Sequence, residues 1–140
     1  MTPQELAATH AAAFFDARGW SPDEFKQLLS QRGVILSGDA TSFVLGRVIV
    51  DEAEVLTVAT DPDFQGQGRA HAAMAQFLGL AQAAGADRVF LEVAEDNTKA
   101  KLLYYKHNFS ISGRRPQYYK KADGQPVDGL LMELKFSDLV

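Results

Sequence analysis

Residues 61–70 read DPDFQGQGRA and lie between a run of β-branched residues and an amphipathic helix pattern. Glycines at such a junction let successive backbone N–H groups point into one concavity, and the helix N-terminus adds its partial positive charge. The stretch therefore favours a phosphate cradle that needs no cationic side chain, although Arg69 could add one. Short glycine patterns also recur by chance, so the stretch alone is equally compatible with a turn before a helix.

Upstream of residues 61–70, the chain predicts two helices followed by three strands. Thr2 and Ser21 each precede a proline and lie three residues before a glutamate, a pattern that opens a helix with a capping box. We expect these helices over residues 3–17 and 22–31. Three runs rich in β-branched residues follow, separated by polar breaks, and they predict an antiparallel meander over residues 34–36, 43–50 and 55–60.

Downstream, a helix pattern over residues 68–84 leads to a strand at 89–93, which is apolar on both faces except for Glu92. A strand, a crossover helix and another strand make a parallel pair, so this strand is expected at the centre of the sheet. One helix and two strands then follow, over residues 97–106, 109–112 and 130–136. The polar segment between the last two strands is expected to be mobile. We predict an α/β (α+β) fold: a mixed, mostly antiparallel twisted sheet with a central parallel strand pair and flanking helices.

Length and composition narrow the class of protein. A chain of 140 residues, 46% hydrophobic and 23% charged, favours one soluble globular domain over residues 1–140. The net charge of −4 argues against direct nucleic-acid binding, because phosphate binding needs a basic surface. No apolar run is long enough to span a membrane and the N-terminus lacks the order of a signal peptide, so the cytoplasm is the expected compartment.

The residues that commonly hold metals or form covalent intermediates are scarce. The sequence contains no cysteine, which removes disulfides, cysteine-rich metal sites and a cysteinyl acyl-enzyme. His10, His71 and His107 lack ligand-like spacing, so no metal is predicted. We expect a monomer or a weak homodimer.

The order of elements around the glycine stretch carries a family resemblance. The chain passes from a meander strand through Asp-Pro, an aromatic residue and Gln65-x-x-Gly68-x-Ala70 to a helix and then a strand. This order resembles the acetyl-CoA-binding core of the GNAT superfamily of N-acetyltransferases. No Gly-Lys-Ser/Thr follows, as it would in a Walker loop. No G-x-G-x-x-G opens a helix with an acidic partner downstream, as it would in a dinucleotide fingerprint.

The second half of the chain extends this likeness to one branch of the superfamily. The chain resembles the bacterial ribosomal-protein alanine N-acetyltransferases, the RimI type, in the order of Leu91-Glu92-Val93, Asn97, Leu103-Tyr104 and Phe109. Residues 114–119, with two arginines and two tyrosines, fit as well, and the likeness spans roughly residues 14–135. It implies acetyl-CoA as cosubstrate and a protein N-terminal α-amine as acceptor.

The resemblance also implies roles for individual residues. Glu92 takes the position of the general base and Tyr104 that of the general acid. The acetyl and pantetheine end of the coenzyme would contact the strand edge at Val58, Ala59 and Thr60. The pyrophosphate loop would comprise Gly66, Gln67, Gly68, Arg69, Ala70 and His71, with Asn97 beside the coenzyme.

A glutamate and a tyrosine suit the two proton transfers that accompany acyl transfer to an amine. An α-amino group has a pKa of about 8 and is mainly protonated at neutral pH, so a carboxylate must take its proton. Glu92 is the only acid in its apolar strand, and the alternative is a glutamate that faces solvent at the mouth of the sheet. Tyr104 lies two helical turns after Asn97 and on its face, but Tyr105 competes for the role and a purely structural tyrosine is common.

Several alternatives stay open from the sequence. The acceptor could be a small-molecule amine, or the chain could bind acetyl-CoA without turnover. The connection between the last two predicted strands forms either a flap over the acceptor or a basic, aromatic arm on the surface. It contains Arg114, Arg115, Tyr118 and Tyr119. The chain departs from the family where it begins at a helix rather than a strand, and where Asn108 replaces glycine.

Overall fold

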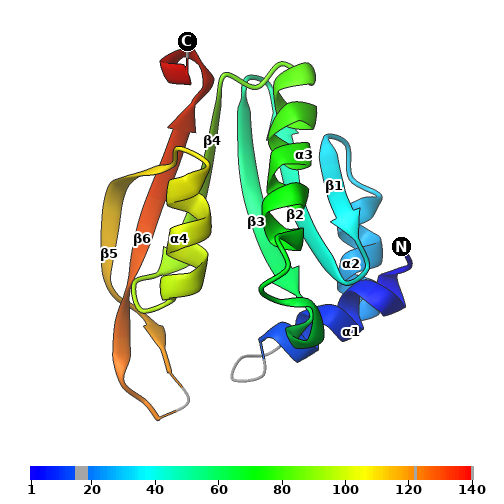
Figure 1. Cartoon of the computed structure of the whole chain (residues 1–140), viewed down its shortest axis with the longest axis vertical. Coiled ribbons are helices and arrows are strands. Elements are labelled where there is room, and N and C mark those ends of the chain that lie inside the picture. Colours follow the sequence, from blue (N-terminus) through cyan, green and yellow to red (C-terminus); the bar gives the residue numbers. More distant parts are fainter. Residues whose placement is uncertain (15–18, 122, 140) are drawn as a thin grey trace.

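The computed structural model describes residues 1–14, 19–121 and 123–139. Six strands form one sheet in the order β1-β2-β3-β4-β6-β5, and β3 and β4 are its parallel pair (Figure 1). The strands are β1 Val34–Asp39, β2 Ser42–Ile49, β3 Glu52–Thr60, β4 Arg88–Ala94, β5 Ser110–Lys120 and β6 Pro126–Lys135. The helices are α1 Pro3–Ala13, α2 Pro22–Leu29, α3 Arg69–Ala83 and α4 Thr98–Lys106, with 3₁₀ turns η1 Pro62–Phe64 and η2 Phe136–Leu139. The predicted mixed sheet with a central parallel pair is confirmed.

The first two helices begin where the capping pattern predicted. The Thr2 hydroxyl accepts from Glu5 N at 3.1 Å while the Glu5 carboxylate accepts from Thr2 N at 2.9 Å, and Ser21 repeats the arrangement. The second helix ends at Leu29, two residues earlier than expected; Ser30 caps it with helical backbone angles, and the chain reverses at Gly33, which has a positive φ of 83°. The first helix also ends early, at Ala13, and the predicted end at Ala17 lies outside the described residues.

Two apolar clusters lie on opposite faces of the sheet. α3 covers β1, β2 and β3 on one face, where its Met74 and Phe77 are fully buried. α4 adds Leu103 and Tyr104 to the same cluster from the β4–β6 half. α1 and α2 pack on the other face around Phe25. The second cluster stops at the β1–β3 half, and among the described residues no helix covers the rest of that face (Figure 1).

Part-way along β3, a β-bulge switches the sheet face to which alternate side chains of the strand point. Leu45 pairs with Thr57 and Gly46 with Val55, so Leu56 is an extra residue. Side chains before and after this point therefore join different clusters. Gly46 is required here, because a Cβ on it would lie 2.4 Å from the Phe77 ring.

The last two strands form a long hairpin, where the sequence predicted a mobile connection. β5 continues to Lys120 and β6 begins at Pro126, so most of residues 113–129 is strand. Asp128 holds the hairpin together, because its carboxylate accepts from Arg114 Nη1 at 2.8 Å and from Gln117 N at 2.8 Å. The prediction failed because β5 is an edge strand with mostly exposed side chains on both faces, so no apolar alternation marks it.

Candidate active site

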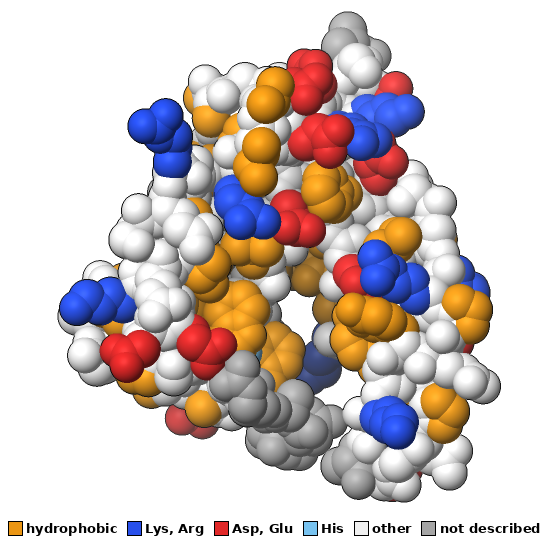
Figure 2. All heavy atoms as spheres, turned by 180° about the vertical axis from the view of Figure 1, so that it is seen from behind, with side chains coloured by type: hydrophobic (Ala, Val, Ile, Leu, Met, Phe, Trp, Pro, Cys, Tyr) orange, Lys and Arg blue, Asp and Glu red, His pale blue; other side chains and the backbone are white. Residues whose placement is uncertain are grey.

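The central parallel strands separate soon after they meet. β3 and β4 pair only at Glu52–Arg88, Ala53–Val89 and Glu54–Phe90. Beyond these pairs, residues 55–60 of β3 and 91–94 of β4 no longer pair with each other, and the ribbons diverge (Figure 1). The space-filling view shows an opening through the molecule (Figure 2). The separation leaves two strand edges whose main-chain groups can bind a ligand.

The glycine stretch forms a concave backbone at the start of α3. Gly66 and Gly68 have positive φ angles of 75° and 77°, and a Cβ built on either would meet nothing within 4 Å. Among the described residues, no acceptor bonds the main-chain amides of residues 66–71. Open space, unpaired amides and a helix N-terminus together suit a diphosphate. The residues present therefore fit the pyrophosphate of a coenzyme.

The side chain of Arg69 is directed away from this concavity. Its Nη1 lies 3.4 Å from Asp39 Oδ2, and its guanidinium carbon lies 4.7 Å from the centre of the Phe64 ring. A cradle at this loop would therefore depend on main-chain amides.

Lys99 supplies a cation that the sequence analysis did not identify. Its Nζ lies 3.4 Å from Gln65 Oε1, so α4 contacts the loop before α3 across the mouth of the opening. A lysine in the first turn of a helix is disfavoured by the helix dipole. That unfavourable position, two residues after Asn97, was the available signal for a ligand of opposite charge.

Asn97 and His71 both take part in local structure. Asn97 Oδ1 accepts from Ala100 N at 3.2 Å and caps α4. His71 Nδ1 lies 3.2 Å from His107 Nε2, so the imidazole of His71 contacts the end of α4. Burial, and secondarily the neighbouring His71, lower the pKa of His107. His71 therefore offers the cradle its amide and not its ring.

The three candidate residues on β3 lie beyond the point where β3 and β4 separate. Val58 is half-buried against the α3 cluster, whereas the Ala59 side chain is buried among α1 and α2. The Thr60 hydroxyl lies 2.8 Å from the Ser42 hydroxyl. A ligand in the opening would therefore meet mainly the backbone of these residues.

Glu92 lies two residues past the last pair of β3 and β4. Leu91 and Val93 point into the α3 cluster, so Glu92 projects from the opposite face of the sheet. Its side chain is 23% exposed, and its Oε1 is buried 3.2 Å from Arg115 Nε. The N–H direction of Arg115 does not make this contact a hydrogen bond, and no other described donor satisfies Oε1.

A glycine makes room for this carboxylate. A Cβ on Gly129 would lie 2.9 Å from Glu92 Oε1 and 3.3 Å from the Tyr119 ring. Glu92 is thus enclosed at the edge of the opening by the β5–β6 hairpin. This position differs from the solvent-facing alternative that the sequence left open.

Tyr104 and Tyr105 face different environments. Tyr104 is 7% exposed and its ring contacts Phe109, whereas Tyr105 is 45% exposed. Burial, with a smaller contribution from Tyr119, raises the pKa of Tyr104 to about 12. Its hydroxyl therefore keeps its proton throughout the neutral range and can donate it.

Tyr119 is electrostatically coupled to both candidate residues. Burial raises the pKa of Tyr119, and the charge of Glu92 raises it further. Tyr119 in turn contributes to the raised pKa of Tyr104. The hairpin thus brings a second phenol to the region of the predicted base and acid, a position that the sequence left undecided between a flap and a surface arm.

Comparison with known proteins identifies the class of enzyme that this fold and opening define. Residues 5–109 match the Acetyltransferase (GNAT) family, and the chain belongs to it. Within that class, the chain is 30% identical over 135 residues to the [Ribosomal protein bS18]-alanine N-acetyltransferase of Escherichia coli (strain K12), covering 94% of this chain and 90% of the relative. The protein is therefore an N-acetyltransferase with relatives of the predicted RimI type.

Solved structures agree with this assignment. The crystal structure of the ribosomal-protein-S18-alanine N-acetyltransferase from Escherichia coli has a TM-score of 0.85 and 26% identity, covering 95% of this chain and 86% of that one. A Salmonella typhimurium acetyltransferase with its cofactor acetyl-CoA shares the fold, with a TM-score of 0.73 and 21% identity over 96% of this chain and 90% of that one.

The described residues offer neither a membrane-spanning helix nor a metal site. No helix within residues 1–14, 19–121 and 123–139 is long and apolar enough to cross a bilayer. The same residues contain no group of three or more histidine, aspartate or glutamate side chains placed to hold a metal ion.

Proposed function

We propose that this N-acetyltransferase uses acetyl-CoA to acetylate a protein N-terminal α-amine directly, with Glu92 as general base and Tyr104 as general acid. One observation carries the proposal: a backbone cradle with unpaired amides opens beside a gap that Glu92 borders from β4, while Tyr104 lies on α4. The printed name of the Escherichia coli relative, which acts on an alanine of bS18, supports a protein acceptor.

The coenzyme would be held chiefly by main-chain groups. The amides of residues 66–71 would bind the pyrophosphate, and the β3 edge at Val58, Ala59 and Thr60 would bind the pantetheine arm. Asn97 would lie beside this path, and Lys99, whose Nζ lies 3.4 Å from Gln65 Oε1, would add a positive charge near the cradle. When bound, acetyl-CoA supplies an acetyl group activated as a thioester.

Glu92 would take a proton from the acceptor. An α-ammonium has a pKa of about 8 and must lose a proton before its nitrogen attacks a carbonyl. The enclosed carboxylate can accept that proton directly or through one water. Arg115 contacts the same oxygen and would have to yield it to the cationic acceptor. A new C–N bond forms as the C–S bond breaks.

Tyr104 would give a proton to the leaving sulfur, and the tyrosinate would regain a proton as the nitrogen releases its second proton to solvent and becomes an amide. With its pKa raised to about 12, the phenol holds its proton in the neutral range and would release it only as negative charge develops on the sulfur. Neither residue forms a covalent bond with the acetyl group, so the transfer is direct.

The Glu92→Gln variant tests the proposal. With a peptide that begins with alanine, we expect kcat to fall by about 10²- to 10⁴-fold, because a general base contributes that range. The dissociation constant for acetyl-CoA should change little, since Glu92 lies away from the cradle. Glu133→Gln, which removes the same charge from β6 on the same sheet face, is the matched control. Turnover unchanged by Glu92→Gln would refute the assignment.

The acceptor is tested with three substrates: the alanine peptide, the same peptide with a blocked N-terminus and one free lysine, and free polyamines or amino acids. Acetylation of the first alone supports the proposal. Acetylation of only the small amines would favour the small-molecule alternative. Binding of acetyl-CoA without thiol release in a single-turnover mixture would favour a non-catalytic binding module.

We also propose that residues 1–140 act as one domain, because both apolar clusters share a single sheet. A ribosomal protein as acceptor would place the reaction in the cytoplasm, where such proteins are made.

A further inference from the structure

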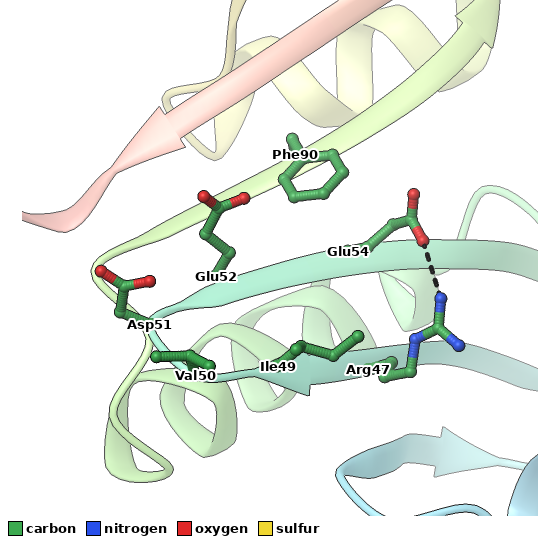
Figure 3. Close-up of a pocket in the computed structure, with 7 residues that line it drawn as sticks. All are labelled: Arg47, Ile49, Val50, Asp51, Glu52, Glu54 and Phe90. Carbon is green, nitrogen blue, oxygen red and sulfur yellow. Dashed lines mark ion pairs between the residues drawn. The ribbon is translucent and has the colours of Figure 1, made fainter.

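A hollow lies on the sheet face that Glu92 also occupies, nearer the β2–β3 turn. Its volume is about 490 Å³ (Figure 3). We call it the acidic groove, and it is lined by Arg47, Ile49, Val50, Asp51, Glu52, Glu54 and Phe90. The described parts of α1 and α2 pack around the other end of this face, so neither lines the groove.

The charges of the acidic groove do not balance. Its lining has three carboxylates and one guanidinium. Arg47 contacts Glu54 at 3.5 Å, and Arg88, just outside, contacts Glu52 at 2.9 Å. Among the described residues, no basic side chain lies within 4.0 Å of the Asp51 carboxylate. A cationic ligand would therefore be attracted to the groove.

The groove also exposes apolar side chains that the fold does not bury. Ile49 is 58% exposed and Val50 is 87% exposed. Val50 has a φ of 58°, which is unfavourable for a β-branched residue. Phe90 forms part of the lining between Glu52 and Glu54 (Figure 3). An exposed, strained valine at one end of the groove and an aromatic ring across it mark a contact surface (Figure 3).

The acidic groove lies on the same sheet face as the base. Phe90 and Glu92 are alternate residues of β4 and therefore project from one face. Glu52 pairs with Arg88, four residues before Glu92, which is about 13 Å at the rise of a strand. An extended peptide covers that distance in about four residues. A chain whose first nitrogen is at Glu92 thus reaches the groove with its next few residues.

We propose that the acidic groove binds the acceptor polypeptide beyond its reacting amine and selects acceptors with lysine or arginine at about the second to fifth residues. Asp51 and Glu54 pair with these cations, and Phe90 contacts their alkyl stems or planar head groups. This inference rests on the proposed function, because only a protein acceptor has residues that follow the amine.

Three peptides test the groove. They share their first two residues and differ at residues three to five, which are all arginine, all glutamine or all glutamate. With the unaltered enzyme we expect kcat/KM to be about tenfold higher for the arginine peptide than for the glutamine peptide, mainly through KM. The preference should weaken as salt rises, because exposed charges are screened.

Two variants attribute the preference to the groove. Asp51→Asn with Glu54→Gln should reduce the arginine-to-glutamine ratio to twofold or less. Asp23→Asn with Asp138→Asn removes two exposed carboxylates elsewhere and should keep the tenfold ratio. Asp51→Lys with Glu54→Lys should favour the glutamate peptide, a gain that a misfolded protein cannot produce.

The outcomes separate the two proposals. Equal use of all three peptides by the unaltered enzyme, or an arginine preference that survives both groove variants, would overturn the groove and leave the acetylation reaction standing. Failure to acetylate any of the three peptides while small amines are acetylated would overturn the protein acceptor, and the groove with it.

Discussion

At the scale of single residues, the proposed chemistry depends on which of several similar side chains is enclosed. Adjacent tyrosines could not be distinguished by sequence pattern, yet one is buried and the other faces solvent. Glu92 could be selected because it interrupts an apolar strand. Its contact with Arg115 could not, because that contact depends on how the distant hairpin packs. Pattern along the chain thus identified the candidates, and packing between elements decided their surroundings.

Removing one hydroxyl tests the predicted acid. Tyr104→Phe keeps the ring in its cluster, so the fold should persist while kcat falls by about 10²-fold or more through loss of the proton donor. Steady-state kinetics with saturating acetyl-CoA would measure the change. Tyr105→Phe, which alters the exposed neighbour, is the control and should leave kcat within twofold. Equal effects of the two substitutions would contradict the assignment.

The same phenol predicts a pH dependence of stability. The pKa of Tyr104 is about 12 in the folded chain, while an unfolded tyrosine ionises at about 10. The neutral buried form therefore contributes fully below about pH 10, and its contribution is lost as pH rises towards 12, at most roughly 2–3 kcal/mol. Denaturant titrations at several pH values should show a smaller alkaline loss in Tyr104→Phe. An identical alkaline loss in both proteins would refute the prediction.

At the scale of elements, the sequence predicted the features that depend on neighbouring residues and missed those that depend on residues far apart in the chain. Both capping boxes depend on contacts three residues apart, and both helix starts were confirmed. The glycine stretch also specifies its own backbone, because positive φ angles favour glycine. β5 depends instead on pairing with β6 and on Asp128, so its own residues lack a strand pattern. Its length and the enclosure of Glu92 could not be predicted from sequence for this reason.

Two glycines at the ends of α3 allow a matched test of the cradle. Gly68 has a φ of 77° and Gly85 a φ of 99°, and neither would bring a Cβ within 4 Å of another group. Alanine at either position should lower the free energy of unfolding by about 1–2 kcal/mol, the cost of left-handed backbone. Only Gly68→Ala should also weaken acetyl-CoA binding, by about tenfold, as measured by calorimetry. Equal coenzyme affinity in both variants would argue against a cradle at residues 66–71.

At the scale of the whole molecule, the sheet is two three-stranded halves joined by a short contact. β1, β2 and β3 form one half, and β4, β6 and β5 the other. They share three register pairs, centred on Ala53 and Val89. The cradle belongs to the first half, while Glu92 and Tyr104 belong to the second. The predicted crossover established that two parallel strands would be neighbours, but how soon they separate depends on the packing of both helical layers.

Coenzyme binding should therefore be detected along the two separated edges. With acetyl-CoA at 100 times its dissociation constant, mass action alone adds about 2.7 kcal/mol to the stability. We expect amide hydrogen exchange to slow most in residues 55–60 and 66–71. The β1–β2 hairpin, which already pairs along its length, provides the internal control. Uniform slowing across both regions would indicate general stabilisation and no ligand between the strands.

The brief junction at Ala53 and Val89 also has a kinetic consequence. The coenzyme loop belongs to one half of the sheet and the proton-transfer residues to the other, and the two halves meet at three register pairs. The alignment of these groups therefore depends on the ligand that lies between the separated strands. If the acceptor amine binds before acetyl-CoA, the distance between Glu92 and the position of the acetyl carbonyl is not yet fixed. We expect an ordered sequence in which the thioester enters first. A dead-end acceptor analogue should then be competitive with the acceptor and uncompetitive with acetyl-CoA in initial-rate measurements, whereas noncompetitive inhibition against acetyl-CoA would indicate random entry.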